Sequence, residues 1–262
     1  MSVRLLPFAL LVALVGCPPP EGEDTQDSEP VDTGEMEPLE PLVSLLVVAA
    51  PHLCGSADNG ARAEAAVAWV NEHAGERGIE LMLIVGDIAW NTGTETAPGL
   101  FSELVVPWVP VTGDNEIQSS DEEAFFLAFE PQWQALAGEL DSFAYAPMPV
   151  DNPEHERQSW FTNLVFQHRG VTFMGLDWCS RTIGGVFGEM ADLHPFDGGT
   201  FDWWLAALDG VDSTTRSSVV MFSHHPMHLS PAAFDLAEME TLETASTAFH
   251  PQIYASLAGH YH

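Results

Sequence analysis

The sequence predicts an α/β domain that spans residues 42–262. Apolar runs of strand length alternate with segments whose apolar residues recur at helical spacing, which is typical of α/β folds. Several of the strand-like runs are apolar throughout, as expected for strands that are buried on both faces of a sheet. Polar residues that can bind metal follow these runs repeatedly, and open α/β sheets place their functional sites at the carboxyl ends of strands.

The first half of the domain supplies three predicted strands and one helix. LVSLLVVAA at 42–50 is a continuous apolar run, and ELMLIV at 80–85 and WVPV at 108–111 are shorter runs of the same kind. Between the first two lies ARAEAAVAWVNEHAG at 61–75, whose apolar residues recur at helical spacing. This alternation is the basis of the α/β prediction for the first half.

The second half continues with a long helical pattern and a hairpin. EEAFFLAFEPQWQALAG at 122–138 is expected to be a helix that is interrupted near Pro131, because proline lacks the N–H that a helix interior requires. The strand-like segments 159–168 and 171–178 are joined by Arg169-Gly170, which predicts a hairpin. The remaining predicted elements are a helix at 201–208 and strands at 218–223 and 252–259.

The first 41 residues are expected to direct export rather than to build a core. Arg4 precedes an apolar run at 5–16, which is too short to cross a bilayer as a helix but suits a signal peptide. LVGC, which ends at Cys17, resembles the lipobox of bacterial lipoproteins, so 1–16 is expected to be removed and Cys17 lipidated. The alternative is an ordinary secretory signal. Residues 17–41 are acidic and proline-rich, as in a disordered tether.

The charge balance excludes some partners. Asp and Glu number 39 whereas Lys and Arg together number 7, which gives a net charge of −32. Such a chain does not bind nucleic acid or an anionic membrane through a basic patch. Contact with the membrane is therefore expected through the N-terminal lipid only, with the domain in the periplasm or at the cell surface.

Two further cysteines follow predicted strands. Cys54 and Cys179 could form one disulfide in an oxidising, exported compartment, provided that the two strand ends are neighbours. The alternative is a pair of buried free thiols.

Residues with metal-binding side chains follow five of the predicted strands: His52, Asp87, Asp114 with Asn115, His224 with His225, and His260 with His262. Imidazole and carboxylate together suit manganese, iron or zinc, whereas magnesium and calcium prefer sites made of oxygen atoms alone. His260 and His262 stand two residues apart, so both can face one cavity from an extended segment.

The order PHL, GD, GDNE, HHP and GHYH over residues 43–262 resembles the calcineurin-like metallophosphoesterase family. The family pattern reads Asp-x-His, Gly-Asp, Gly-Asn-His-Asp/Glu, His-His-Pro and Gly-His-x-His. The resemblance implies a metallophosphoesterase-type α/β sandwich, in which two β-sheets are flanked by helices. It also implies that metal-bound hydroxide at a binuclear site hydrolyses a small phosphate mono- or diester, with two divalent ions (Mn, Fe or Zn) as cofactors.

Carried over by position, the resemblance implies two sets of ligands. One metal would be bound by His52, Asp87 and His262, and the other by Asp87 as the bridging residue together with Asp114, His224 and His260. His225 has less claim to a ligand role, because the first histidine of the pair is the usual ligand. Six histidines lie outside the family pattern and are expected to be structural or exposed: His73, His155, His168, His194, His228 and His250.

Three positions depart from the family pattern. Ala50 replaces the first aspartate and cannot bind metal, whereas Asp114 replaces the asparagine and adds a carboxylate. Asn115 replaces the histidine thought to assist the leaving group or bind phosphate, which makes it the candidate catalytic residue. Asn115 can hydrogen-bond a phosphate oxygen but cannot donate a proton as an imidazolium does, so weak activity is expected.

Two other functions are compatible with parts of this pattern. A degenerate homologue with one metal or none could act as a surface binding protein, because Ala50 depletes the first site. A carbohydrate-binding or adhesion module would require the histidine pattern to be coincidental. Family members continue past Gly-His-x-His with further strands, so the chain is expected to be truncated after His262.

Overall fold

The computed structural model describes residues 10–13, 43–90, 93–119, 122–183, 189–211, 219–227, 233–249 and 253–261. Three predictions fall outside these ranges: the lipidation of Cys17, the tether at 17–41, and the ligand His262. Of the predicted signal peptide, only the backbone of Leu10–Ala13 is described; it forms strand β1, which pairs antiparallel with β2.

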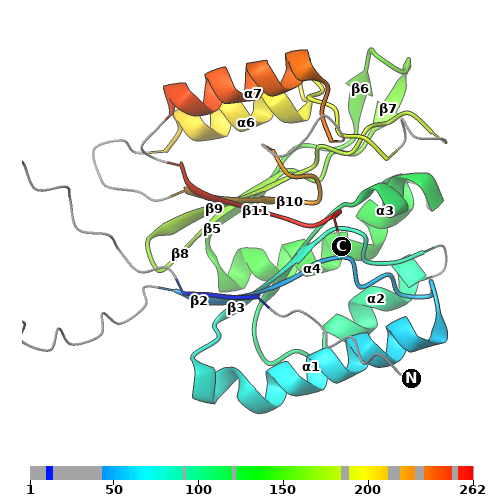
Figure 1. Ribbon diagram of the computed structural model, residues 1–262, viewed down its shortest axis with the longest axis vertical. Coiled ribbons are helices and arrows are strands. Elements are labelled where there is room, and N and C mark those ends of the chain that lie inside the picture. The colour runs from blue at the N-terminus through cyan, green and yellow to red at the C-terminus, as the bar shows by residue number, and fades with distance from the viewer. Residues whose placement is uncertain are drawn as a thin grey trace, which may run out of the picture.

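Two β-sheets form the centre of the molecule (Figure 1). The first sheet contains β2 (Ser44–Val48), β3 (Leu81–Val85) and β4 (Trp108–Val111), which are parallel, with β1 at its edge. The second sheet has the order β11 (Ile253–Ala258), β10 (Val219–Ser223), β9 (Val171–Leu176), β8 (Leu164–His168), β5 (Asp141–Tyr145). Its first three strands are parallel, whereas β8 and β5 run antiparallel. A small hairpin of β6 (Val150–Asn152) and β7 (Arg157–Ser159) stands apart.

Helices cover both outer faces of the sheet pair (Figure 1). On the side of the first sheet lie α1 (Ala57–Arg77) and α2 (Gly93–Phe101), and on the side of the second lie α6 (Thr200–Asp209) and α7 (Leu236–Ala248). Two more helices, α3 (Asp114–Ser119) and α4 (Glu122–Glu139), follow β4. The predicted α/β sandwich of two sheets flanked by helices is confirmed.

The apolar residues form two cores on either side of the second sheet. The larger core includes every residue of β3, together with inward side chains of α1 and α4 and of the second sheet, such as Phe166 and Phe222. The smaller core joins the other face of that sheet to α6 and α7 through residues such as Trp204 and Leu242. This double burial explains why the central strands are apolar on both faces.

Some local predictions were wrong. Helix α4 is continuous through Pro131, because Phe125, Phe129, Trp133 and Leu136 are buried on either side of it, and their packing outweighs one lost hydrogen bond. The predicted strand at 159–168 begins only at Leu164. Helices α2 and α7 and strands β5 to β7 were not predicted.

The disulfide is also absent. Cys54 is an exposed free thiol and Cys179 a buried one, so the structure does not pair them. The Cys179 sulfur lies 3.7 Å from the carbonyl oxygen of Thr112 and 3.7 Å from Nδ1 of His225. It therefore packs against the loops of the first and second sheets without crosslinking them.

Within the described ranges, no helix combines the length and the apolar character that a bilayer crossing requires.

Candidate metal centre

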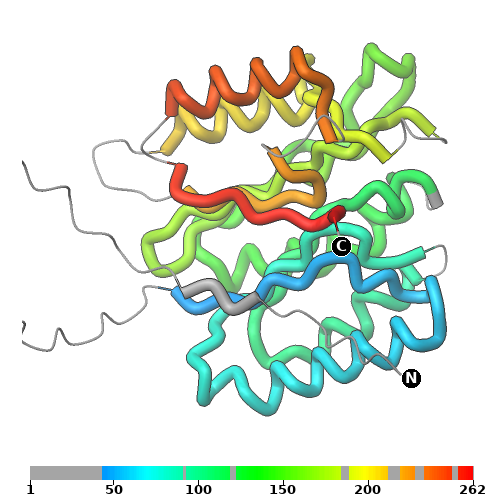
Figure 2. Tube along the Cα trace, in the orientation of Figure 1, coloured from blue at the N-terminus to red at the C-terminus, as the bar shows by residue number. Residues whose placement is uncertain are grey.

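The carboxyl ends of the parallel strands of both sheets meet at one place. His52 follows β2, Asp87 follows β3, and Asp114 follows β4; His224 follows β10 and His260 follows β11. The C-terminal segment lies against the end of the first sheet (Figure 2). Gly259 approaches β3 so closely that a Cβ atom added to it would lie 2.8 Å from the Val85 carbonyl oxygen. The predicted ligands that the structure describes therefore come together from two sheets.

Three ligand atoms converge most closely. The Nε2 atom of His224 lies 2.7 Å from Oδ1 of Asp114 and 3.1 Å from Nδ1 of His260. Nδ1 of His260 lies 3.7 Å from the same Asp114 oxygen. All three side chains are largely shielded from solvent, since their exposed fractions are 0%, 6% and 16% for His224, Asp114 and His260.

The hydrogen bonds of this cluster favour a cation between the three atoms. Nδ1 of His224 lies 3.1 Å from the carbonyl oxygen of Val85, which can only accept, so Nδ1 carries the proton. In the neutral ring, Nε2 then presents its lone pair to Asp114. Oδ1 of Asp114 is buried and has no hydrogen-bond donor among the described residues. A divalent ion satisfies both groups, and the donor set suits manganese, iron or zinc.

Asp87 lies between the two predicted metal positions. Its Oδ1 atom is 3.4 Å from Nε2 of His224, and its Oδ2 atom is 3.9 Å from Nε2 of His52. The backbone N–H of Asn115 donates to Oδ1 at 3.0 Å, which fixes the carboxylate. Each carboxylate oxygen thus faces a different histidine, as a bridging ligand requires.

In the absence of a cation, the pKa values of Asp87 and Asp114 shift in opposite directions. Burial, together with repulsion from Asp114, raises the pKa of Asp87 to about 8. Burial also disfavours the charged form of Asp114, but without a cation the His224 and His260 rings can hold protons that they donate to Asp114, which keeps the pKa of Asp114 well below its ordinary value. A bound divalent ion would favour the charged form of both carboxylates.

Asn115 contacts the histidine of the other predicted site. Its side-chain nitrogen lies 2.8 Å from Nδ1 of His52. Asn115 is buried, whereas the His52 side chain retains 22% of its exposure. The candidate catalytic amide therefore lies at the centre and contacts a predicted ligand directly.

Ala50 supplies no ligand atom to the first site. Its backbone N–H donates to the Gly86 carbonyl at 3.2 Å. Its side chain is a methyl group, which cannot coordinate a metal ion. Among the described residues, the first site therefore rests on His52 and Asp87. The second site, with Asp114, His224, His260 and Asp87, is the richer in ligands.

His225 joins the cluster, although sequence reasoning gave the ligand role to His224 alone. One of its ring nitrogens lies within 4.8 Å of the ligand atoms of Asp114, His224 and His260. Nε2 donates to the Glu189 carbonyl at 3.1 Å, and burial with the neighbouring imidazoles lowers the pKa of His225 to about 3. A neutral, fully buried imidazole is thus held beside the second site, and the His-His pair was its only sequence signal.

Glu116 ties together the two loops that present the aspartates. Its carboxylate accepts the N–H of Ala89 at 2.9 Å and the N–H of Gly113 at 2.7 Å. Burial, together with the charge of Asp87, raises the pKa of Glu116 to about 8. Glu116 therefore holds the loops after β3 and β4 in one register.

A buried ion-pair network supports the Asp114 loop from behind. Arg181 is fully buried and binds Asp177 at 2.8 Å and Glu122 at 2.8 Å. Asp177 accepts the N–H of Thr162, whose hydroxyl lies 2.5 Å from that of Thr112. Asp177 directly follows β9, but it faces Arg181 and supports the site rather than joining it.

Close approach and unusual backbone geometry mark the ligand loops. A Cβ atom on Gly113 would overlap the backbone nitrogen of Asp87, and one on Gly86 would lie 2.6 Å from Cβ of His224. Positive φ angles occur at Ala50, His52, Asp87 and His260. Such strain is concentrated at functional sites, where the surrounding structure enforces it.

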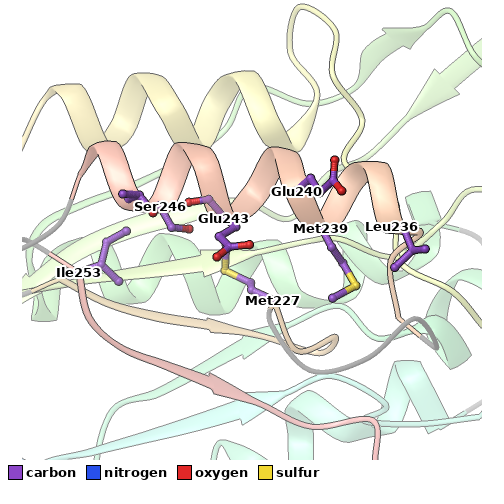
Figure 3. A pocket seen from close by; sticks show the side chains of 8 residues that line it. Met227, Leu236, Met239, Glu240, Glu243, Ser246 and Ile253 are labelled. Atoms are coloured by element: carbon purple, nitrogen blue, oxygen red, sulfur yellow. Dashed lines mark hydrogen bonds between the residues drawn. The ribbon is translucent and has the colours of Figure 1, made fainter.

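A separate cavity of about 660 Å³ lies beneath α7 (Figure 3). Its lining includes Met227, Met239 and Ile253, with Glu240 and Glu243 from the helix. None of its lining residues belongs to the ligand cluster, so this cavity is not the metal centre.

Comparisons with known proteins agree with this geometry. The family model of the calcineurin-like phosphoesterases matches residues 45–262. The fold resembles the crystal structure of a dimetal phosphatase from Danio rerio, with a TM-score of 0.55 and 14% sequence identity. That similarity covers 84% of this chain and 82% of the other. A search of curated proteins gave no match. The extent of the family match shows that this chain belongs to the calcineurin-like phosphoesterase family.

Proposed function

We propose that the chain hydrolyses a phosphate mono- or diester at a centre of two divalent ions. The observation that carries this proposal is the convergence of Asp114 Oδ1, His224 Nε2 and His260 Nδ1 within 2.7 to 3.7 Å, with the buried Asp114 oxygen lacking a hydrogen-bond partner among the described residues. Family membership supports a metal-dependent phosphoesterase in general. The position of Asp87, whose two oxygens face different histidines, supports a binuclear arrangement.

The candidate ligands fall into two sets, one for each proposed ion. Asp114, His224 and His260 would hold one ion and share Asp87 with the other, which His52 and the predicted ligand His262 would complete. When bound, such ions polarise phosphoryl oxygens and lower the pKa of water. Val85 fixes the ring of His224, and Asn115 fixes the carboxylate of Asp87, so the ligands are oriented before an ion arrives.

Asn115 limits the kind of substrate. Its buried side chain can hydrogen-bond a phosphoryl oxygen, but an amide does not protonate a departing alkoxide. General acid catalysis contributes roughly 10²–10⁴-fold where it operates. Esters with good leaving groups, such as aryl phosphates, are therefore the favoured substrates.

The test compares a ligand variant with a charge-matched control. Asp114→Ala is expected to lose at least one bound manganese ion and to reduce kcat/KM for an aryl phosphodiester by more than about 100-fold, since an ion contributes several kcal/mol of stabilisation. Asp202→Ala removes an exposed carboxylate from α6 and should change neither quantity. Wild-type activity that survives EDTA unchanged would refute the proposal.

Ala50 favours a second candidate, a degenerate homologue that binds ligands without efficient catalysis. The described residues give the first site only His52 and Asp87, so its occupancy is the weak point of the centre. Ala50→Asp distinguishes the two functions. A large rise in both turnover and metal content would identify the natural chain as degenerate, whereas no change would show a site adapted to its own ligands.

We also propose, from the sequence, that the domain is exported and lipid-anchored through Cys17, in the periplasm or at the cell surface. The apolar run at 5–16 and the LVGC sequence support this location. Cys17→Ser expressed in a bacterium should lose the lipid mass and leave the membrane fraction, whereas Cys54→Ser should retain both. Equal fractionation of the two variants would count against lipidation.

A further inference from the structure

A second group of potential metal ligands lies outside the centre. It consists of Glu154, Asp192 and His194, whose ligand atoms all lie within 4.8 Å of one another. Glu154 sits in the turn between β6 and β7, whereas Asp192 and His194 belong to the segment between β9 and α6. None of the three is part of the family pattern, and His194 was expected to be structural or exposed.

The orientation of His194 is fixed by a bond on its far side. The ring is fully buried, and Nε2 lies 3.0 Å from the carbonyl oxygen of Cys179, to which it must donate. In the neutral ring, Nδ1 therefore carries the lone pair. Nδ1 lies 3.2 Å from Oε2 of Glu154, to which a protonated ring would donate, and 3.7 Å from Oδ1 of Asp192. In the neutral ring the lone pair faces both carboxylates, and neither has a proton to offer it.

The separations between the ligand atoms fit shared coordination of one ion as well as they fit an ion pair. Charge-assisted hydrogen bonds from a protonated ring to a carboxylate are about 2.7–2.9 Å long. Two ligands about 2.0–2.2 Å from one tetrahedral zinc ion stand roughly 3.3–3.5 Å apart. The two distances from Nδ1, 3.2 and 3.7 Å, bracket that separation, although the shorter one is also within hydrogen-bond distance.

From this geometry we infer that Glu154, Asp192 and His194 form a site for one divalent first-row ion, best matched by zinc. One imidazole and two carboxylates offset the charge of the ion, and water takes the remaining position. The carboxylate side chains are 33% and 31% exposed, so an ion can enter from solvent while the histidine stays buried.

The ligands are held in place before an ion binds. Asn152 accepts the N–H of Glu154 at 2.9 Å, and Asp192 accepts the N–H of His194 at 2.9 Å. The backbone N–H of Asp192 donates to the Trp178 carbonyl at 2.8 Å. An ion at this site would fasten the β6–β7 hairpin to the segment that leads to α6, so its role is structural.

The experiment counts zinc ions in matched variants of the full chain. After equilibrium dialysis against zinc, Glu154→Gln should hold one ion fewer per chain than the wild type, and its zinc-dependent rise in Tm should be smaller. Glu156→Gln removes the same charge from the same exposed turn and should match the wild type. Asp192→Asn should repeat the loss seen for Glu154→Gln.

Two results would overturn the inference. Equal zinc content in Glu154→Gln and the wild type would show that His194 forms only an ion pair with its neighbours. A loss of one ion from Glu156→Gln as well would show a general perturbation of the turn. The site is independent of the proposed hydrolysis, because Glu154→Gln should retain manganese-supported activity, whereas Asp114→Ala should lose activity and keep the zinc that depends on Glu154.

Discussion

Asn115 governs how His52 presents its ring to the metal centre. With the amide nitrogen 2.8 Å from Nδ1, the ring proton sits on Nε2, which points toward Asp87. The same amide turned by 180° places its oxygen there, holds the proton on Nδ1 and frees the Nε2 lone pair for an ion. The two ends of an amide have nearly the same shape, so on the proposed function a metal ion bound to His52 would select the second arrangement.

Asn115→Leu should therefore weaken the first site selectively. Loss of a partner that orients a metal-binding histidine reduces affinity by roughly 10–100-fold. Metal titration by calorimetry should show this loss for the weaker of two binding events, with the tighter event unchanged. Asn115→His restores a ring that can donate and should recover part of the affinity; equal weakening of both events would contradict the assignment.

Glu116 should make the metal-free chain less stable as pH rises. Its pKa of about 8 in the folded chain exceeds the value of 4.5 expected for the unfolded chain. Between these values the folded state binds more protons, so the free energy of unfolding falls as pH increases and the stabilisation is lost through about pH 8. Asp87, with a pKa of about 8, acts in the same direction.

The measurement is Tm in EDTA from pH 5 to pH 8. Glu116→Gln stays neutral throughout, so its Tm should fall less steeply than that of the wild type. Glu139→Gln, an exposed position at the end of α4, should retain the wild-type slope. Parallel slopes for all three chains would show that Glu116 ionises normally.

At the scale of elements, Arg181 joins the start of α4 to the end of β9. Its guanidinium binds Glu122 and Asp177 while it is fully buried, and a second arginine, Arg157, also reaches Glu122 at 2.7 Å. Asp177 accepts the backbone N–H of Thr162, and the Thr162 hydroxyl accepts the backbone N–H of Thr112. Thr112 directly precedes Gly113 and Asp114. The network thus positions the candidate ligand Asp114 from an element that supplies no candidate ligand.

Arg181→Met should destabilise the chain by about 3–5 kcal/mol, because it leaves two buried carboxylates without their shared cation. Arg169→Met is the control, since Arg169 pairs with Glu80 at 2.7 Å but its side chain is 60% exposed. An exposed pair contributes about 0–1 kcal/mol. Urea unfolding in EDTA would measure both, and similar losses would contradict the role of burial.

The elements that sequence reasoning found and missed differ in a physical way. β3 and β4 are buried along their whole length, so their apolar runs are unambiguous. In α7 only Leu242 is fully buried, so no apolar stripe marks the helix, although Asp235 and Glu238 form a capping box at its start. Pro98 within α2 is a residue that normally argues against a helix.

The same contrast applies to the site. The convergence of the predicted ligands was predictable, because parallel strands bring their carboxyl ends to one edge. The position of His225, the support from Arg181 and the grouping of Glu154 with His194 depend on contacts between distant segments. Spacing along the chain carries no information about those contacts, so sequence reasoning missed them.

At the scale of the whole molecule, the net charge of −32 should repel anionic substrates and attract cations. Salt at 0.1 M screens charges beyond about 10 Å. On the proposed function, kcat/KM should rise with ionic strength, more steeply for a dianionic aryl phosphomonoester than for a monoanionic diester. Zinc affinity should fall over the same range. Equal salt dependence of the two substrates would show that local charges at the centre outweigh the net charge.

The candidate ligands of the metal centre follow strands of two different sheets, with Asp87 and Asp114 after strands of the first and His224 and His260 after strands of the second. An ion held among them is a crosslink that the covalent chain does not provide at that edge. Relative sliding of the sheets would then be resisted at the ligand edge and free at the opposite one. Amide hydrogen exchange should therefore slow on metal loading mainly at the carboxyl ends of β3 and β10. The supply of metal would then determine how rigid the two-sheet sandwich is.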